Sequence, residues 1–129
     1  MPKKIKVLLK TPSIDDLDDL QREYIRLRDK VCRKCGKTFD LQVAHIFSKG
    51  AGGKAVRWDE DNVVLLCRKH HLYWAHKEPI EFNDWVKEQL GETKFNNLKL
   101  RAHDVSKADR SAVACYLKQR ISELEKREE

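Results

Sequence analysis

The sequence has no long hydrophobic run, and no stretch of its 129 residues approaches the roughly 20 apolar residues of a membrane span. Residues 1–10 also lack the cleavage pattern of a secretory signal peptide. We therefore expect an intracellular, cytoplasmic protein without a membrane partner. Internal repeats are absent as well, and the length favours a single domain, 1–129, with a modest core of its own.

Cysteine is scarce, because the chain contains only four. Cys32 and Cys35 form a Cys-x-x-Cys pair, and Cys67 and His70 form a Cys-x-x-His pair. In a reducing compartment these spacings are more typical of metal ligands than of disulfides. Four such donors suit tetrahedral Zn²⁺, and a site closed by four protein ligands is structural rather than catalytic. The remaining cysteine, Cys115, falls in a helical pattern and is expected to be a small buried hydrophobic residue.

Charge is plentiful and unbalanced toward the basic side. Charged residues make up 37% of the chain, and the formal net charge is +6 with a pI of about 9.2. Such a surplus favours an anionic partner, either nucleic acid or an acidic membrane surface, although it also serves solubility alone. The lysine-rich residues 1–12 are expected to form a basic arm, as an edge strand or as a mobile tail.

The first strong helical pattern covers residues 13–31. Ser13 and Asp16 are spaced as a capping box, and the apolar residues that follow are three and four apart. Four aspartates near its start and three basic residues near its end suit the helix dipole. We therefore predict an amphipathic helix and assign these charges to the dipole rather than to a metal site.

Helical periodicity then disappears until the second cysteine pair. Short apolar runs at 41–47 and 63–66 predict strands around a glycine-rich loop at 48–54. This loop lacks the G-x-x-x-x-G-K-[ST] order of a nucleotide-binding P-loop. We interpret it as a flexible connection whose Lys49 and Lys54 contact a phosphate backbone.

The remainder of the chain predicts helices. A helix through the second cysteine pair is expected to stop near Pro79, which opens the next helix, and Gly91 is the natural end of that one. A short helix follows, and a second capping box at 106–109 precedes a terminal helix. With helices over 79–129 and a core with short strands over 32–78, the expected fold class is α+β.

Three polar residues lie between or beside the two metal-ligand pairs. These are His45, Asn62 and His71. A hydrolytic nuclease needs a base to deprotonate water, a divalent cation at the scissile phosphate, and a group that orients the base. A metal bound by both pairs would draw His45 and His71 together, so their residue types and positions favour such a site.

The ordered combination of Cys-x-x-Cys, Ala-His-Ile, Asp-Asn and Cys-x-x-His-His resembles the HNH, or ββα-metal (His-Me finger), endonucleases, and phage-encoded members in particular. Further similarities are Glu-Tyr-Ile-Arg-Leu-Arg at 23–28, Arg-Trp-Asp at 57–59 and Glu-Phe-Asn-Asp-Trp at 81–85. The resemblance covers about residues 13 to 91 and extends loosely over the terminal helix. It implies a zinc-stapled ββα-metal core, with flanking helices, that cleaves DNA in phage packaging or recombination, in the host cytoplasm and beside other phage DNA-processing proteins.

The resemblance also implies residue roles. His45 matches the general base, Asn62 the residue that orients this base or braces its loop, and His71 a ligand of catalytic Mg²⁺ or Mn²⁺. The structural zinc ligands are Cys32, Cys35, Cys67 and His70.

One position departs from the family's pattern. Many members carry Asp or His directly before the base, as a second ligand of the catalytic cation, whereas this chain has Ala44. Mg²⁺ tolerates one protein ligand with waters and phosphate oxygens, so activity is compatible with the change. His76, Asp59 or Asp61 are candidates for the missing ligand; alternatively, His76 caps a helix and the acids belong to a turn.

Arg57 is the residue that we expect to bind the phosphate, because a guanidinium matches two phosphate oxygens. Arg68, Lys49 and Lys54 would add a salt-dependent grip without base recognition. Two rival hypotheses remain. The chain is either a zinc-stabilised nucleic-acid-binding module without catalysis, which Ala44 favours, or a structural, protein-binding domain of a phage assembly.

Overall fold

The computed structural model describes residues 10–48, 54–104 and 108–128, and it has an α+β fold that is mostly helical. Residues 1–9 of the predicted basic arm, 1–12, and Lys49 lie outside these residues. In chain order the elements are α2 (Ile14–Asp29), β1 (Leu41–His45), η1 (Lys54–Val56), η2 (Glu60–Asn62), β2 (Val63–Cys67), η3 (His70–Ala75), α3 (Pro79–Leu90), α4 (Glu92–Ala102) and α5 (Arg110–Glu128). No helix of the described part is long and apolar enough to cross a membrane.

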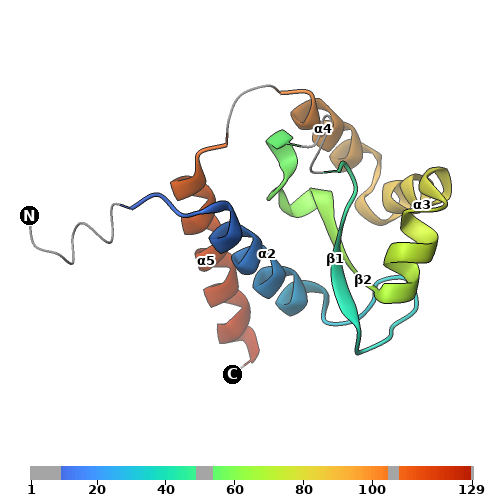
Figure 1. Ribbon diagram of the computed structural model, residues 1–129, viewed down its shortest axis with the longest axis horizontal. Coiled ribbons are helices and arrows are strands. Elements are labelled where there is room, and N and C mark those ends of the chain that lie inside the picture. The colour runs from blue at the N-terminus through green and yellow to red at the C-terminus, as the bar shows by residue number, and fades with distance from the viewer. Residues whose placement is uncertain (1–9, 49–53, 105–107, 129) are drawn as a thin grey trace, which may run out of the picture.

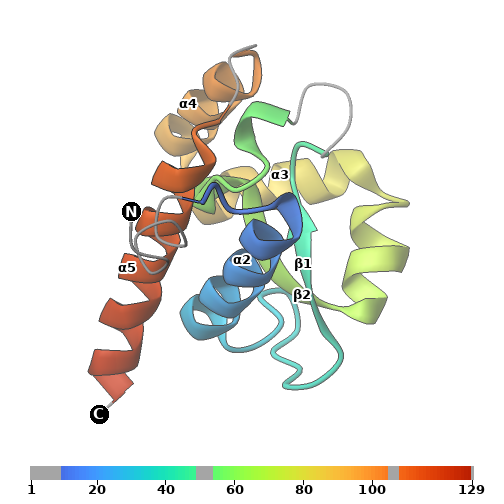
Figure 2. The ribbon, with the colours of Figure 1, turned by 60° about the vertical axis from the view of Figure 1, so that its left-hand side comes forward.

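The two strands form an antiparallel pair in which Leu41 lies opposite Cys67 and His45 opposite Val63. Helices cover both faces of this small sheet: α2 and α5 lie on one side, and η3 and α3 on the other (Figures 1 and 2). Because side chains alternate along a strand, β2 serves both layers. Leu65 packs toward α2 and α5, and Leu66 packs toward α3.

The predicted capping box of the first helix is confirmed. The Ser13 hydroxyl accepts a hydrogen bond from the Asp16 N–H at 3.0 Å, and the Asp16 carboxylate accepts one from the Ser13 N–H at 3.0 Å. At the other end, Lys30 adopts a left-handed conformation with a φ of 67° and ends the helix. The helix buries Leu17 and Tyr24, and it supplies the wall against which the sheet packs.

The C-terminal end of α2 also binds the outer side of β2. Asp29 accepts a hydrogen bond from the Leu65 N–H at 3.0 Å, and Arg28 donates one to the Val63 carbonyl at 2.8 Å. The Leu65 carbonyl accepts from the Arg33 N–H at 2.9 Å. Burial acts to lower the pKa of Arg28, but the hydrogen bonds and charge of Asp29 outweigh it and raise this pKa.

The segment after β2 is a π-helix over His70–Ala75 rather than a regular helix. The predicted stop before Pro79 and the new start at Pro79 are confirmed. Gly91 ends α3 with a φ of 86°, a conformation that favours glycine, and α4 begins directly after it.

Two predictions for the terminal helix need correction. Of the expected capping box, Ser106 lies outside the described residues, and Asp109 caps α5 by accepting the Ala112 N–H at 3.1 Å. The expectation that Cys115 is buried is wrong, because its side chain is exposed. The buried stripe of α5 runs through Ala114, Leu117 and Ile121. Cys115, one position away from Ala114, points to the outer face.

Candidate metal centre and histidine cleft

The two ligand pairs converge on one point. We call Cys32–Cys35 the first knuckle and Cys67–His70 the second, and the ligand atoms of their four donor residues all lie within 4.8 Å of one another. The Cys35 and Cys67 sulfurs are 3.8 Å apart, and the His70 Nδ1 is 3.2 Å from the Cys67 sulfur and 3.8 Å from the Cys32 sulfur. Tetrahedral ligands placed about 2.3 Å from zinc are separated by about 3.7 Å, so the donor set fits this ion.

The backbone folds each knuckle around the centre. Cys67 is the last residue of β2, and His70 is the first of η3. In the first knuckle, Gly36 has a φ of 82° and its N–H donates to the Cys32 carbonyl at 2.8 Å, which closes the turn. A strand end and a tight turn thus hold the donors in place.

Local electrostatics favour the metal-binding protonation states of Cys32 and His70, whereas the pKa of Cys35 is raised: a backbone hydrogen bond at Lys37 lowers it, but burial and the neighbouring Cys32 and Cys67 outweigh that effect. Burial opposes the Cys32 thiolate, but hydrogen bonds from backbone N–H groups of the knuckles outweigh it and lower the pKa of Cys32. Burial, together with the charges of Lys69 and Lys34, lowers the pKa of His70. Metal ligands are the deprotonated thiolate and the neutral imidazole, so both shifts act in the direction that binding requires.

The other two predicted histidines share a separate cleft of about 430 Å³. His45 comes from the end of β1, and His71 from the first turn of η3. The wall opposite them is the polar face of α2, with Asp18, Arg22 and Arg26. The structure therefore brings His45 and His71 to one cavity, beside rather than inside the Cys3His centre.

Each cleft histidine has one ring nitrogen next to a carbonyl oxygen. The His45 Nε2 lies 3.0 Å from the Arg57 backbone carbonyl, and the His71 Nδ1 lies 2.7 Å from the Gln42 amide oxygen. A carbonyl oxygen only accepts, so these nitrogens carry the protons. In the neutral imidazoles the lone pairs are then on the His45 Nδ1 and the His71 Nε2, the atoms that a base and a metal ligand would use.

Asn62 is completely buried and braces the loop that follows β1. Its amide oxygen accepts the Phe47 N–H at 2.8 Å, and its amide nitrogen donates to the carbonyls of Phe47 and Val56. Of the two roles expected for this residue, the hydrogen bonds support the brace. Because Val56 precedes Arg57, the brace also fixes the carbonyl that holds His45.

The predicted phosphate-binding arginine has an internal partner. Nε and Nη2 of Arg57 donate to the Asp18 carboxylate at 3.1 and 2.7 Å, and the Trp58 indole donates to the same carboxylate at 2.9 Å. These hydrogen bonds raise the pKa of Arg57. The guanidinium is thus engaged by α2, whereas Lys54 and Arg68 are exposed to solvent.

The position before His45 offers no ligand, since Ala44 is buried and its side chain has no donor atom. Asp59 and Asp61 both pair with Arg101, at 2.6 and 3.2 Å, and line a different pocket. His76 is the residue after η3, and its ring centre is 4.6 Å from that of His71. Of the three candidates for the missing ligand, only His76 is therefore in contact with a cleft histidine.

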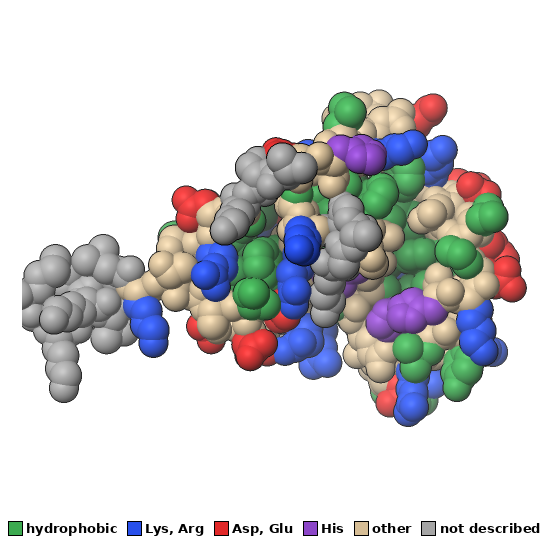
Figure 3. Space-filling model, turned by 45° about the horizontal axis from the view of Figure 1, so that its top comes forward, with side chains coloured by type: hydrophobic (Ala, Val, Ile, Leu, Met, Phe, Trp, Pro, Cys, Tyr) green, Lys and Arg blue, Asp and Glu red, His purple; other side chains and the backbone are tan. Residues whose placement is uncertain are grey.

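Five cleft residues were missed at the level of the sequence: Asp18, Gln21, Arg22, Arg26 and Gln42. Asp18, Arg22 and Arg26 are spaced by four, which places them on one helix face, but at the level of the sequence the charges of Asp18 and Arg26 are assigned to the helix dipole and Arg22 is given no role. Arg26 has no hydrogen-bond or ion-pair partner among the described residues, whereas Arg22 pairs with Asp19. Figure 3 shows Lys and Arg side chains on the same side of the molecule as Asp and Glu side chains, so charge alone marks no single site on the side in view.

The described residues thus define an α+β protein with a Cys3His site that can hold a metal ion such as zinc. Comparison of the chain with protein-family models, with curated proteins and with solved structures finds no match.

Proposed function

We propose that the protein is a metal-dependent endonuclease of the HNH, ββα-metal type that hydrolyses DNA phosphodiester bonds. The observation that carries the proposal is the cleft in which His45 and His71, each oriented by a carbonyl oxygen, face two arginines of α2. A base, a nitrogen ligand and fixed positive charge are the groups that phosphodiester hydrolysis requires.

The order of the elements supports the same proposal. β1 and β2 are antiparallel and are followed directly by η3, and the Cys3His centre joins the end of β2 to the start of η3. This order suits a ββα-metal unit stapled by structural zinc. Folds of one kind serve many activities, so the cleft carries the functional argument.

His45 is the general base of the proposed reaction. Its Nδ1 takes a proton from water as the water oxygen forms a bond to phosphorus, and the bond from phosphorus to the 3′ oxygen breaks. The leaving oxygen takes a proton from solvent. The Arg57 carbonyl keeps the Nε2 proton in place, so the base presents the same nitrogen throughout.

His71 would hold the catalytic cation through Nε2, with His76 beside it. A Mg²⁺ or Mn²⁺ ion with so few protein ligands would keep waters and take phosphate oxygens. When bound, it stabilises the negative charge on the phosphate and on the leaving oxygen. Arg26, and Arg22 beside it, would contact the flanking phosphates.

Plasmid nicking tests the proposal. Wild-type protein is expected to nick supercoiled DNA in Mg²⁺ or Mn²⁺, and His45→Ala is expected to be about 100-fold slower or more. The matched control is His103→Ala, which removes an exposed histidine at the end of α4. Equal nicking by wild type and His45→Ala, or no nicking with any divalent cation, would contradict the assignment.

A second candidate is a zinc-stabilised nucleic-acid-binding module without catalysis. Two observations favour it: Ala44 has no ligand atom, and Arg57 is paired with Asp18. This module would bind DNA with a steep dependence on salt and retain zinc without nicking.

A further inference from the structure

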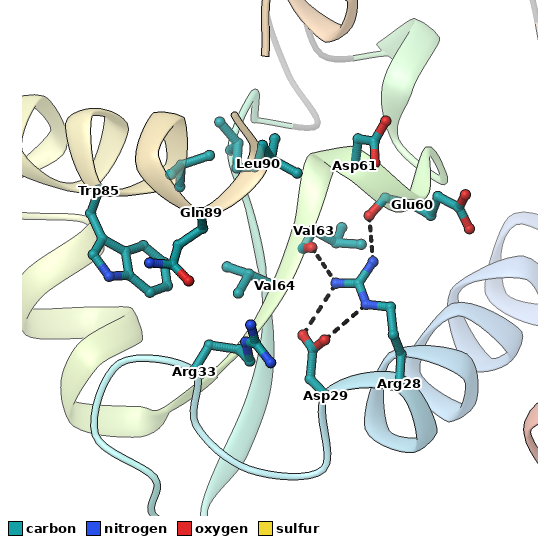
Figure 4. A pocket seen from close by; sticks show the side chains of 12 residues that line it. Arg28, Asp29, Arg33, Glu60, Asp61, Val63, Val64, Trp85, Gln89 and Leu90 are labelled. Atoms are coloured by element: carbon teal, nitrogen blue, oxygen red, sulfur yellow. Dashed lines mark hydrogen bonds and ion pairs between the residues drawn. The ribbon is translucent and has the colours of Figure 1, made fainter. Parts of the chain in front are cut away.

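A second hollow lies beside the outer side of β2, where the end of α2, the first knuckle and α3 meet (Figure 4). Its volume is about 300 Å³, at the lower end of the range for pockets that bind small ligands. Ile46 lines this hollow, whereas the preceding residue, His45, lines the cleft. The two cavities are therefore distinct.

One wall of the hollow consists of groups that the fold already uses. Arg28 donates to the Asp29 carboxylate at 2.8 Å and to the carbonyls of Glu60 and Val63. Asp29 also accepts the Leu65 N–H. Figure 4 shows this network on one side of the hollow, and it forms a fixed polar wall rather than a set of ligand-binding groups.

The other wall carries groups that the fold does not use. Arg33 of the first knuckle and Gln89 of the last turn of α3 point into the space, with the Trp85 indole beside them and Val64 between the two walls (Figure 4). Within the described residues, neither the Arg33 guanidinium nor the Gln89 amide has a hydrogen-bond partner. The backbone of Arg33 is nevertheless fixed, because its N–H donates to the Leu65 carbonyl at 2.9 Å.

Within the described part of the chain, the charges around the hollow leave Arg33 as the lining cation without an acidic partner, and the neighbouring Lys34 lies over the Trp74 ring. Each carboxylate that lines the hollow has a cationic partner: Asp29 pairs with Arg28, Glu60 with Arg120 and Asp61 with Arg101. The Lys34 ammonium lies 5.8 Å from the centre of the Trp85 ring, which places positive charge next to the aromatic wall.

We propose that this hollow binds one unpaired nucleotide of a nucleic-acid strand. A flat base matches the Trp85 and Val64 surfaces, its polar edge matches an amide that both donates and accepts, and its phosphate matches the Arg33 guanidinium. The volume suits a single nucleotide rather than a base pair. Such a pocket goes beyond the proposed cleavage, because the protein would then recognise DNA that has a single-stranded flank or an opened end.

Fluorescence anisotropy with zinc-loaded His45→Ala protein tests the pocket without cleavage of the probe. The probes are a labelled oligothymidylate and a duplex of the same length. Gln89→Ala leaves the charge unchanged and is expected to weaken binding of the single strand about fivefold, with little effect on the duplex. Equal affinity of Gln89→Ala and the parent for the single strand contradicts the pocket.

The second knuckle provides a matched control for Arg33. Arg68 follows Cys67 as Arg33 follows Cys32, and it does not line the hollow. Arg33→Ala and Arg68→Ala remove the same charge and should weaken duplex binding equally. Arg33→Ala should weaken single-strand binding about tenfold more than Arg68→Ala does. Equal losses on the single strand overturn the inference, and zinc content and melting curves establish that the variants are folded.

Competition by thymidine monophosphate distinguishes a nucleotide pocket from a surface that needs a whole strand. If thymidine monophosphate displaces the labelled strand from the parent but less well from Gln89→Ala, the result supports a pocket for one nucleotide. If it displaces the strand equally well from both proteins, the result contradicts the pocket. All of these experiments measure binding by the His45→Ala protein, so they do not depend on cleavage. Absence of nicking by the wild type would contradict the proposed function, and the binding measurements would still test the pocket.

Discussion

The Cys3His centre and the histidine cleft adjoin each other but are built in different ways. In the centre, four donors from two short knuckles converge within 4.8 Å. In the cleft, His45 and His71 are oriented by groups on a loop and on β1, and the opposite wall belongs to α2. Local spacing therefore determines the centre, whereas contacts between distant segments determine the cleft.

The neighbouring residues His70 and His71 belong to the two different sites. His70 directs Nδ1 toward the Cys67 sulfur at 3.2 Å, and His71 directs Nδ1 toward Gln42 at 2.7 Å. Adjacent histidines on one helix thus serve two sites. Loss of metal from the centre should disturb both sites, while changes in the cleft should leave the centre intact.

The largest expected effect is the loss of the centre. Structural zinc contributes on the order of 10 kcal/mol to the folding of small zinc domains. We therefore expect Cys67→Ser to lose zinc and to lack a cooperative melting transition. Cys115→Ser, which changes an exposed cysteine, should keep both. Elemental analysis and circular dichroism give the measurements, and a Cys67→Ser protein with one zinc per chain would refute a four-ligand centre.

The next largest effect is expected at Asn62, on the side of the cleft. Asn62→Ala removes three hydrogen bonds to Phe47 and Val56 and leaves buried backbone groups without partners. A loss of about 3 kcal/mol in the free energy of unfolding is expected, with zinc retained. Urea denaturation measures it, and the exposed Asn97→Ala is the control. A change of less than about 0.5 kcal/mol would contradict the brace.

A smaller effect, confined to the cleft, is expected for Gln42→Leu. Loss of the oxygen that orients a metal-binding histidine typically weakens metal affinity by about 10- to 100-fold. Mn²⁺ binding, followed by electron paramagnetic resonance, should weaken to this extent, while zinc content and the melting temperature stay the same. Gln119→Leu on α5 is the matched control. An unchanged Mn²⁺ affinity would show that Gln42 does not orient a ligand of the proposed cation site.

The smallest effect is expected for Arg26→Ala. A side chain that contacts one phosphate contributes about one unit to the slope of log affinity against log salt concentration. DNA binding by Arg26→Ala should therefore show a slope lower by about one unit. Arg127→Ala, near the end of α5, carries the same charge change away from the cleft. Identical slopes for the two variants would exclude a phosphate contact that is specific to Arg26.

The sequence predicted those features of the structure that depend on residues close together in the chain. The capping box at Ser13, the strand pair and the start of α3 at Pro79 were predicted, and the spacing of the knuckles predicted donors that the fold brings together. Helix caps, hydrophobic alternation and ligand spacing act over a few residues, so a single sequence displays them.

The cleft was less predictable because its contacts span long distances in the sequence. The pair between Asp18 and Arg57 joins residues 39 positions apart, and Gln42 reaches His71 across 29. No local pattern distinguishes these partners from solvated side chains. The error at Cys115 has another cause: a shift of one residue turns a helical position by about 100°, from the buried stripe to the surface.

The hydrogen bonds of Arg28 and Asp29 to the outer edge of β2 also bear on self-association of the protein. Val-Val-Leu-Leu at 63–66 is uncharged and rich in β-forming residues, the type of segment that recruits strands from other molecules. The Asp29 carboxylate and the Arg33 N–H occupy both backbone groups of Leu65, so an incoming strand finds no free hydrogen-bonding partner there. Two residues, one at the end of a helix and one in the first knuckle, thus block strand addition at the middle of β2.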